Sequence, residues 1–255
     1  MTRTLAFIQA RMSSSRFPGK VLAPLQGRPL IVYMVERVRQ ACLLDGVVVV
    51  TSTDASDDVL ATTLAQAHIP VFRGDLQDVL KRFADAAASC EATEIVRLTG
   101  DCPLIDPTVI DAVIAARRTA QADYASNIDP PSFPDGLDVE CFTREVLDRA
   151  CRLATRVPER EHVTLWMRGD AAGLHRVNLR APVDCSALRL TVDYPDDLQA
   201  VQTLADGLPT APASDLYDLL RVLAQRPDIL NLNRHDRNEG LTHSLQVESG
   251  APHAP

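Results

Sequence analysis

A polar loop near the start of the chain carries the first residues that could do chemistry. It runs from residue 10 to residue 20 and combines basic side chains with serine hydroxyls and a glycine. Positive charge together with many hydrogen-bond donors suits a polyphosphate, because its oxygens need both counter-charges and donors. The candidate ligands are Arg11, Ser13, Arg16, Gly19 and Lys20. The loop matches neither GxxxxGK[ST] nor GxGxxG, which disfavours a Walker-type ATPase and a dinucleotide-binding dehydrogenase.

Two aspartates follow apolar segments further along the chain. Asp101 comes directly after EIVRLTG, and Asp193 comes directly after LRLTV. A carboxylate just past a strand can hold Mg2+ against the phosphates of a nucleotide. On the residues alone either aspartate could equally cap a helix, since a proline that can begin a helix stands two positions later in both cases.

These groups depend on a fold that brings them together. Short apolar runs alternate with stretches of helical periodicity, which predicts a Rossmann-like, doubly wound, mostly parallel α/β sheet. Strands are predicted at 4–9, 46–51, 71–72, 94–98, 137–142, 174–179 and 188–192. Helices are predicted from about 29, up to about 67, over 75–88, 107–119, 143–154 and 158–168, and from 195. Ligands of such sheets bind beyond the carboxyl ends of the strands, so loop 10–20 and turn 100–103 should face one crevice.

The same pattern suggests how the chain is organised. Residues 1–233 are expected to form a single domain. A small α+β excursion is expected at about 130–180, where turn formers and an alternating strand interrupt the main pattern. Residues 234–255 lose periodicity and are expected to be a C-terminal arm that either packs on the domain or is mobile.

Several blocks of sequence recur in one known family. They are IQARMSSSRFPGKVL (8–22), RGD (73–75), DVLKRF (78–83), RLTGDCPLI (97–105), FPDGLDVE (133–140), REHVT (160–164) and LTVDYPDDL (190–198). In this order they resemble the cytidylyltransferases that activate sialic acid, KDO and related acids, and they are closest to the SpsF-like branch named for spore-coat polysaccharide synthesis. The resemblance spans about residues 4 to 200 and implies a fold of the nucleotide-diphospho-sugar transferase type.

The resemblance implies that CMP is transferred from CTP to an acidic sugar or similar small acid, with release of pyrophosphate, for surface polysaccharide or glycoconjugate synthesis. The implied catalytic residues are Arg11, Lys20 and Asp101. The basic pair would neutralise the departing pyrophosphate. In the family Asp101 holds Mg2+ (or Mn2+), and Asp193 matches the second metal-binding aspartate. The implied nucleotide site consists of Ala10, Arg11, Ser13, Arg16, Gly19, Lys20, Arg73 and Gly100. Arg73 could equally brace the helix that follows it.

The acceptor site is drawn from matching blocks on the far side of the expected metal. Its candidates are Arg97, Asp138, Glu140, Arg160 and His162. Arginine pairs well with carboxylates, which favours an acidic acceptor, while the acidic residues would suit an amino-bearing sugar. Arg160 could instead be an exposed helix start, and His162 a packing residue or a general base.

The identity of the acceptor stays open. The KDO enzymes place a glutamate-proline pair after the first metal aspartate, whereas Cys102 and Pro103 stand there in this chain. KDO itself is therefore not implied. Phosphonates and other small phosphorylated acids remain alternative acceptors.

Composition narrows the classes of partner. The chain has 26 Lys and Arg against 34 Asp and Glu, a net charge of -8 that disfavours a long nucleic-acid contact. The six cysteines lack the spacing of a metal site or a CxxC pair, so we expect them to be reduced. We find neither a signal peptide nor an apolar run of ~18 residues, and we expect a cytoplasmic protein without membrane insertion.

The sequence also leaves open a glycosyltransferase, a non-catalytic binding module and a homodimeric assembly. A metal-dependent glycosyltransferase that uses a nucleotide sugar would be expected to carry a DxD-type pair, but Asp138 and Glu140 lie in an alternating strand. A non-catalytic binding module would have no need of two metal aspartates. The excursion suggests a homodimer, for which Phe133, Leu137, Val139 and Phe142 offer apolar side chains, although these could equally form a local core.

Overall fold

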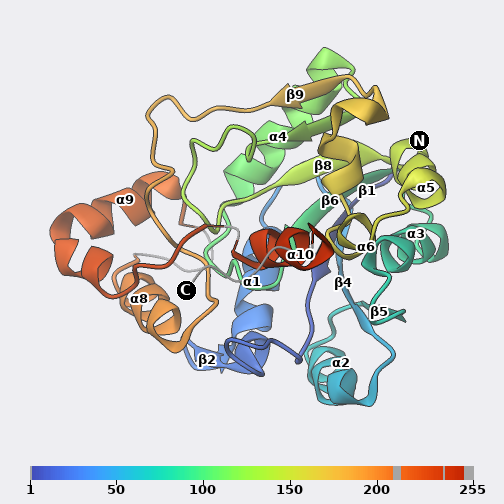
Figure 1. The fold of residues 1–255 in the computed structure, drawn as a ribbon. Coiled ribbons are helices and arrows are strands. Elements are labelled where there is room, and N and C mark those ends of the chain that lie inside the picture. Colours follow the sequence, from blue (N-terminus) through green and yellow to red (C-terminus); the bar gives the residue numbers. More distant parts are fainter. Residues whose placement is uncertain (1, 209–213, 238, 250–255) are drawn as a thin grey trace.

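The computed structural model describes residues 2–208, 214–237 and 239–249, without the side chain of residue 243. A seven-stranded sheet runs through the molecule, with helices on both of its faces (Figure 1). The strand order is β5-β4-β1-β6-β8-β7-β9. The strands are β1 (Thr4–Gln9), β4 (Gly46–Ser52), β5 (Val71–Gly74), β6 (Glu94–Thr99), β7 (Tyr124–Ser126), β8 (Glu140–Thr143) and β9 (Arg176–Asn178). A separate two-stranded ribbon joins β2 (Pro24–Leu25) to β3 (Arg28–Pro29).

Helices alternate with the first strands, as the predicted doubly wound fold requires. They are α1 (Leu30–Val38), α2 (Asp58–Gln66), α3 (Val79–Ser89), α4 (Pro107–Ala120), α5 (Arg144–Leu153), α6 (Val157–Glu161), α7 (Leu165–Arg168), α8 (Pro195–Asp206), α9 (Leu216–Gln225) and α10 (Glu239–Ser249). The prediction of a mostly parallel α/β sheet is confirmed. Strands β5, β4, β1 and β6 are parallel to one another, and β8 runs antiparallel between β6 and β7.

Each face of the sheet has its own core. Along β1, Ala6 and Ile8 pack into one cluster while Leu5 and Phe7 pack into the other, because successive side chains of a strand point to opposite faces. The first cluster is covered by α1, α2, α4, α8 and α9, and the second by α3, α5 and α7. A strand buried on both faces explains why the strand sequences read as continuous apolar runs.

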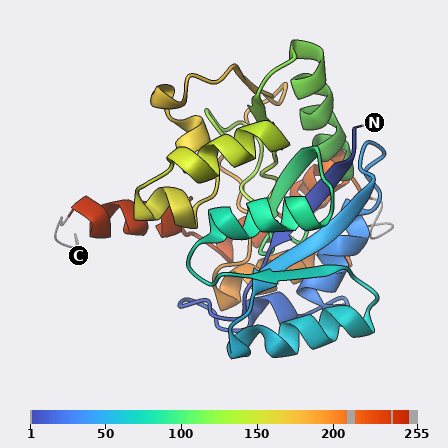
Figure 2. The same ribbon diagram turned by 90° about the vertical axis from the view of Figure 1, so that its right-hand side faces the viewer.

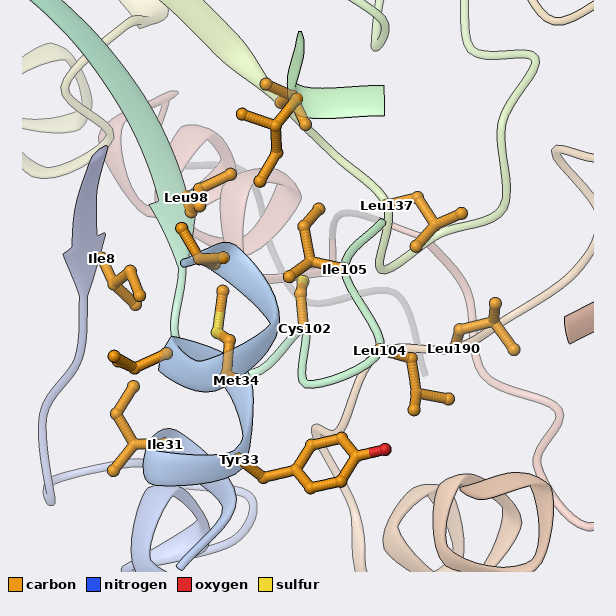
Figure 3. Close-up of a cluster of buried hydrophobic side chains, with 14 of the residues drawn as sticks. Ile8, Ile31, Tyr33, Met34, Leu98, Cys102, Leu104, Ile105, Leu137 and Leu190 are labelled. Atoms are coloured by element: carbon orange, nitrogen blue, oxygen red, sulfur yellow. The ribbon is translucent and has the colours of Figure 1, made fainter. Parts of the chain in front are cut away.

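The loop after β6 is anchored in the first core. Met34 of α1 lies in one buried cluster with Cys102, Leu104 and Ile105 (Figure 3). The buried guanidinium of Arg37 donates from Nε to the carbonyl of Ile105 at 2.9 Å. The residues that follow the strand are therefore fixed by packing and by hydrogen bonds.

The carboxyl ends of β1 and β6 lie side by side. Gln9 stands opposite Thr99 in the parallel register, so the next residues of both strands meet at the edge of the sheet. A Cβ on Gly100 would come within 2.9 Å of the Ala10 Cβ and 3.0 Å of the Gln9 carbonyl oxygen. Only glycine allows the two chain segments to approach this closely.

The strand predicted at 188–192 is wrong, since this segment does not join the sheet. Its backbone pairs with loops instead. The Leu190 N–H donates to the carbonyl of Asp135 at 2.6 Å, and the Val192 N–H donates to the carbonyl of Asp101 at 2.7 Å. This second bond holds the residue after Val192 next to the loop that follows β6.

The excursion at 130–180 forms part of the main body. The side chains of Phe133, Leu137, Val139 and Phe142 are at most 7% exposed and pack into the two main cores, so they are not available to a second copy. The final described segment is the helix α10, which packs beside α6 and projects from the body (Figure 2). Among the described residues, every helix is too short or too polar to cross a membrane.

Candidate active site

A cavity of about 980 Å3 opens where β1 and β6 end. The predicted site residues that line it are Ala10, Arg11, Arg16, Lys20, Arg97, Gly100, Asp101, His162 and Asp193. A second cavity of about 200 Å3 shares several of these side chains and adds Asp138 and Glu140. The structure thus places most of the sequence-derived candidates at one crevice, at the position where open α/β sheets bind ligands.

Lys20 is the central charge of the larger cavity. A left-handed Gly19 (φ 75°) ends the polar loop and starts a 3-10 turn at Lys20–Leu22, which turns the lysine inward. The ammonium Nζ lies 2.9 Å from Asp101 Oδ2 and 2.8 Å from Asp193 Oδ1. Burial alone would lower the pKa of Lys20, but the two carboxylates outweigh it and raise the pKa above its ordinary value.

The same contacts keep the two aspartates ionised. Burial acts to raise the pKa of Asp101 and of Asp193, but Lys20 lowers both, and Arg16 lowers that of Asp193 further. Two ionised carboxylates drawn from separate segments give a set of oxygen donors, the type that Mg2+ and Mn2+ prefer. The ammonium of Lys20 contacts both carboxylates, so the two lie close enough to bind a single cation.

A rigid brace stands behind Asp193. Arg189 donates to Asp197 at 2.8 Å and to Asp135 at 3.0 Å. The carboxylate of Asp197 accepts from the backbone N–H of Asp193 at 2.9 Å and from the side chain of Asn233 at 2.9 Å. These bonds fix the backbone that carries Asp193.

The contacts of Arg189 with Asp197 bear on a neighbouring group of possible metal ligands. Ligand atoms of Asp196, Asp197 and His235 lie within 4.8 Å of one another, close enough to hold a metal ion. However, Asp197 is fully buried and already bound to Arg189. We therefore assign this group to the support of the cavity.

Two carboxylates that line the smaller cavity differ in their surroundings: Glu140 is held by neighbouring side chains, and Asp138 has an unusual pKa. Glu140 pairs with Arg97, its partner in the register of β6 and β8, and accepts from the hydroxyl of Tyr124. Asp138 pairs with Arg237. Burial nevertheless raises the pKa of Asp138 to about 7 against the effect of Arg237, and nearby carboxylates add to the rise.

Four of the predicted site residues line neither cavity, namely Ser13, Gly19, Arg73 and Arg160. Ser13 and Gly19 do not line them, whereas Ser14 and Ser15 line the larger one. The polar loop thus brings serines to the crevice from the two positions that follow Ser13.

Arg73 and Arg160 form braces. Arg73 donates to the backbone carbonyls of Ser52 and Asp54 at 2.7 and 3.0 Å and pairs with Asp58 at the start of α2. Arg160 pairs with Asp78 before α3 and donates to the carbonyl of Cys151 in α5 at 2.7 Å. Their guanidinium groups thus hold helices in the free protein, and a contact of either residue with a ligand stays a prediction.

The C-terminal segment supplies cavity residues that are not among the predicted site residues. The larger cavity is also lined by Arg237, Glu239, Gly240, Thr242 and Ser244. One contact that holds this segment at the cavity is the hydrogen bond from the Tyr194 hydroxyl to Glu239 at 2.8 Å. Its partners are distant in the sequence, so the tertiary fold brings the segment to the site.

Comparison with known proteins identifies relatives along most of the chain. A family model described as cytidylyltransferase matches residues 5–202. The spore coat polysaccharide biosynthesis protein SpsF of Bacillus subtilis is 35% identical over 236 residues, which cover 89% of this chain and 97% of that protein.

Solved structures agree with this result. A cytidylyltransferase from Leptospira borgpetersenii has a TM-score of 0.87 at 28% identity, covering 93% of this chain and all of that one. A CMP-2-keto-3-deoxy-manno-octonic acid synthetase complexed with CTP has a TM-score of 0.64 at 20% identity, covering 80% and 99%. A Mycobacterium tuberculosis protein solved with manganese has a TM-score of 0.55 at 20% identity, covering 79% and 98%. The last two show a shared fold.

Proposed function

Because the chain belongs to the cytidylyltransferase family, we propose that this nucleotidyltransferase transfers CMP from CTP to an acidic sugar of the sialic acid, KDO or pseudaminic acid kind, or to a related small acid. Pyrophosphate is the second product. The name of the Bacillus subtilis relative supports a role in making surface polysaccharide or another glycoconjugate.

One observation carries the proposal, namely the cluster of Arg16, Lys20, Asp101 and Asp193 at the edge of the sheet. The cluster lines a cavity whose volume of about 980 Å3 suits a nucleoside triphosphate. When a triphosphate enters, Arg11, Arg16 and Lys20 can neutralise its oxygens, and Lys20 with Arg11 then stabilises the charge on the departing pyrophosphate.

The residues present fit a divalent ion. We assign Mg2+ or Mn2+ to Asp101 and Asp193, both of which are held ionised by neighbouring cations. When bound, such an ion neutralises phosphate charge and polarises the α-phosphate. Lys20 contacts both carboxylates in the free protein, so its ammonium must leave them when the ion binds.

We assign the acceptor to the smaller cavity beside the metal aspartates. Arg97, Arg168, Asp138, Glu140 and His162 line it. Glu140 is bound by Arg97 and Tyr124, so its role is to hold Arg97 in place. The arginines favour an acceptor with a carboxylate.

The test is pyrophosphate release. The purified protein is incubated with Mg2+, each of the four nucleoside triphosphates, and a panel of sialic, KDO, pseudaminic and legionaminic acids, amino sugars and small phosphonates. Release with CTP and one acid is the expected result. Release of a nucleoside diphosphate from a nucleotide sugar, together with no release of pyrophosphate from CTP, would establish the glycosyltransferase alternative.

We also propose that the protein is a homodimer. Its contact would use the surface of the excursion, where Leu153 and Val157 expose 53% and 74% of their area. Size-exclusion chromatography with light scattering is expected to give twice the chain mass of 27.8 kDa. A single chain mass at micromolar concentration would reject the dimer.

A further inference from the structure

The helix α10 forms a contact with His162 that the proposed function does not use. The Ser244 Oγ lies 3.0 Å from His162 Nε2 and donates to Glu161 Oε2 at 3.0 Å. His162 lines both cavities, whereas Ser244 comes from a segment beyond residue 202, where the match to the family ends.

The geometry of this contact selects one form of the imidazole ring. A serine hydroxyl has a single hydrogen, and an ionised carboxylate can only accept. Because Ser244 gives its hydrogen to Glu161, its oxygen must accept from His162, so the ring proton is on Nε2. The other nitrogen, Nδ1, has no hydrogen-bond partner among the described residues and remains free to accept a proton.

We propose that Ser244 is a positioning residue that fixes the His162 ring with Nε2–H toward α10, leaving Nδ1 to take the proton of the acceptor hydroxyl. This inference rests on the proposed function. The carboxylates of the smaller cavity on the acceptor side are each held by an arginine, Asp138 by Arg237, Asp135 by Arg189 and Glu140 by Arg97.

The proton transfer completes a balanced reaction. The acceptor oxygen forms a bond to the α-phosphorus of CTP, and the bond from that phosphorus to the bridging oxygen breaks, so pyrophosphate leaves with the electron pair. The hydroxyl proton passes to Nδ1 of His162. The resulting imidazolium has its Nε2 3.8 Å from Glu161 Oε2, which stabilises the new charge, and it releases the proton to solvent after the products leave.

The surroundings of His162 keep the ring neutral before reaction. Burial lowers its pKa below 6.5, and the positive charges of Arg97, Arg168 and Arg11 lower it further, while Glu161 opposes them. These are the charged groups that face the ring from β6, α7, the polar loop and α6. A neutral ring near pH 7 can act as a base.

The first test compares substitutions within α10. Ser244→Ala should lower kcat about tenfold with little change in the KM for CTP, and Ser244→Thr, which keeps the hydroxyl, should recover most of the loss. Ser249→Ala is the matched control, because this exposed serine of the same helix bonds only to the carbonyl of Gln246. Equal rates for Ser244→Ala and Ser249→Ala, or no recovery in Ser244→Thr, would overturn the proposal.

The second test does not depend on turnover. Nitrogen-15 shifts of the His162 ring, assigned by their loss in His162→Gln, report the tautomer in the free protein. We expect the Nε2–H form in the wild type and a mixture in Ser244→Ala. A wild-type ring with its proton on Nδ1 would contradict the positioning role even if CTP is turned over, and absence of turnover with any acceptor would reject the proposed function alone.

Discussion

At the residue scale, Lys20 separates two negative charges that would otherwise repel each other. Its side chain is 9% exposed, and it binds both Asp101 and Asp193. A buried ion pair adds little net stability while it is intact, but removal of one partner leaves an uncompensated charge. The cluster therefore makes the protein sensitive to loss of this single cation.

Lys20→Met should lower the free energy of unfolding by about 3 kcal/mol without divalent ions. Mg2+ should restore part of this loss, since the two carboxylates would bind it in place of the ammonium. Thermal unfolding with and without Mg2+ measures both effects. Lys81→Met is the matched control, because Lys81 pairs with Asp85 on the surface. Equal behaviour of the two variants would contradict the proposed role of Lys20.

Asp101→Asn should lower kcat by about 100-fold or more, because it removes one of the two carboxylates assigned to the metal. The fold should persist, since the side chain lies at a cavity rather than in the core. Pyrophosphate release and circular dichroism check the two expectations. Asp85→Asn on the surface should keep full activity, and an active Asp101→Asn protein would show that the metal site lies elsewhere.

Asp138 should make stability depend on pH. Its pKa is about 7 in the folded protein against an ordinary value of 3.8, so between these values the folded state binds more protons than the unfolded state. Stability that is present below pH 4 is therefore lost as the pH rises to about 7. Relative to Asp138→Asn, the wild type should lose about 2–3 kcal/mol between pH 5 and pH 8 in urea unfolding. The surface variant Asp148→Asn should show the same change of unfolding free energy with pH as the wild type. If Asp138→Asn also shows the wild-type change, the pH dependence does not come from Asp138.

The sequence predicted part of this chemistry. Asp101 and Asp193 were singled out because each follows an apolar run, and the structure brings both to Lys20. Arg237 and Ser244 are not among the predicted site residues, since their partners are about 100 and 80 residues away in the chain. Arg160 was placed in the acceptor site because its block matches a family motif, yet its charge is used by Asp78.

At the element scale, α1 is tied to the site by one buried arginine. Arg37 donates to the carbonyls of Ile105 and Ser214 at 2.9 and 2.6 Å and is completely buried. Three segments distant in sequence are thereby held together. Removal of the guanidinium would break these buried hydrogen bonds.

Arg37→Met should therefore lower the free energy of unfolding by about 2–3 kcal/mol, because it breaks several buried hydrogen bonds that a charged group donates. Arg39→Met, in the exposed residue that follows α1, should have a small effect. Chemical unfolding of the two variants compares them directly. Similar losses would mean that the apolar contacts of α1, and not Arg37, hold the loop.

The position of a strand can be predicted from the sequence where both faces of the strand are buried. The predicted strand at 4–9 coincides with β1, because this strand is buried on both faces and reads as one apolar run. The apolar run at 188–192 gave the same signal but pairs with loops, since its partners are chosen by the tertiary fold. The short β7 and the helix α10 carry too little periodicity to be recognised.

At the scale of the whole molecule, α10 is attached mainly by polar contacts. None of its described side chains is buried, and it packs against the short helix α6. A stop after residue 237 should leave the unfolding temperature within a few degrees of the full chain, since the cores are untouched. The KM for the acceptor should rise, because Glu239, Gly240 and Leu241 of this helix line the smaller cavity assigned to the acceptor. A large fall in the unfolding temperature would instead show that α10 supports the fold.

The position of Lys20 also has a consequence for the order of binding. An ammonium and a divalent ion compete for the same two carboxylates, while a triphosphate offers that ammonium new anionic partners. Each ligand thus removes the obstacle to the other, which makes their affinities cooperative. By thermodynamic linkage, CTP must strengthen metal binding by the same factor by which the metal strengthens CTP binding. Calorimetric titration of either ligand in the presence and absence of the other measures that single factor.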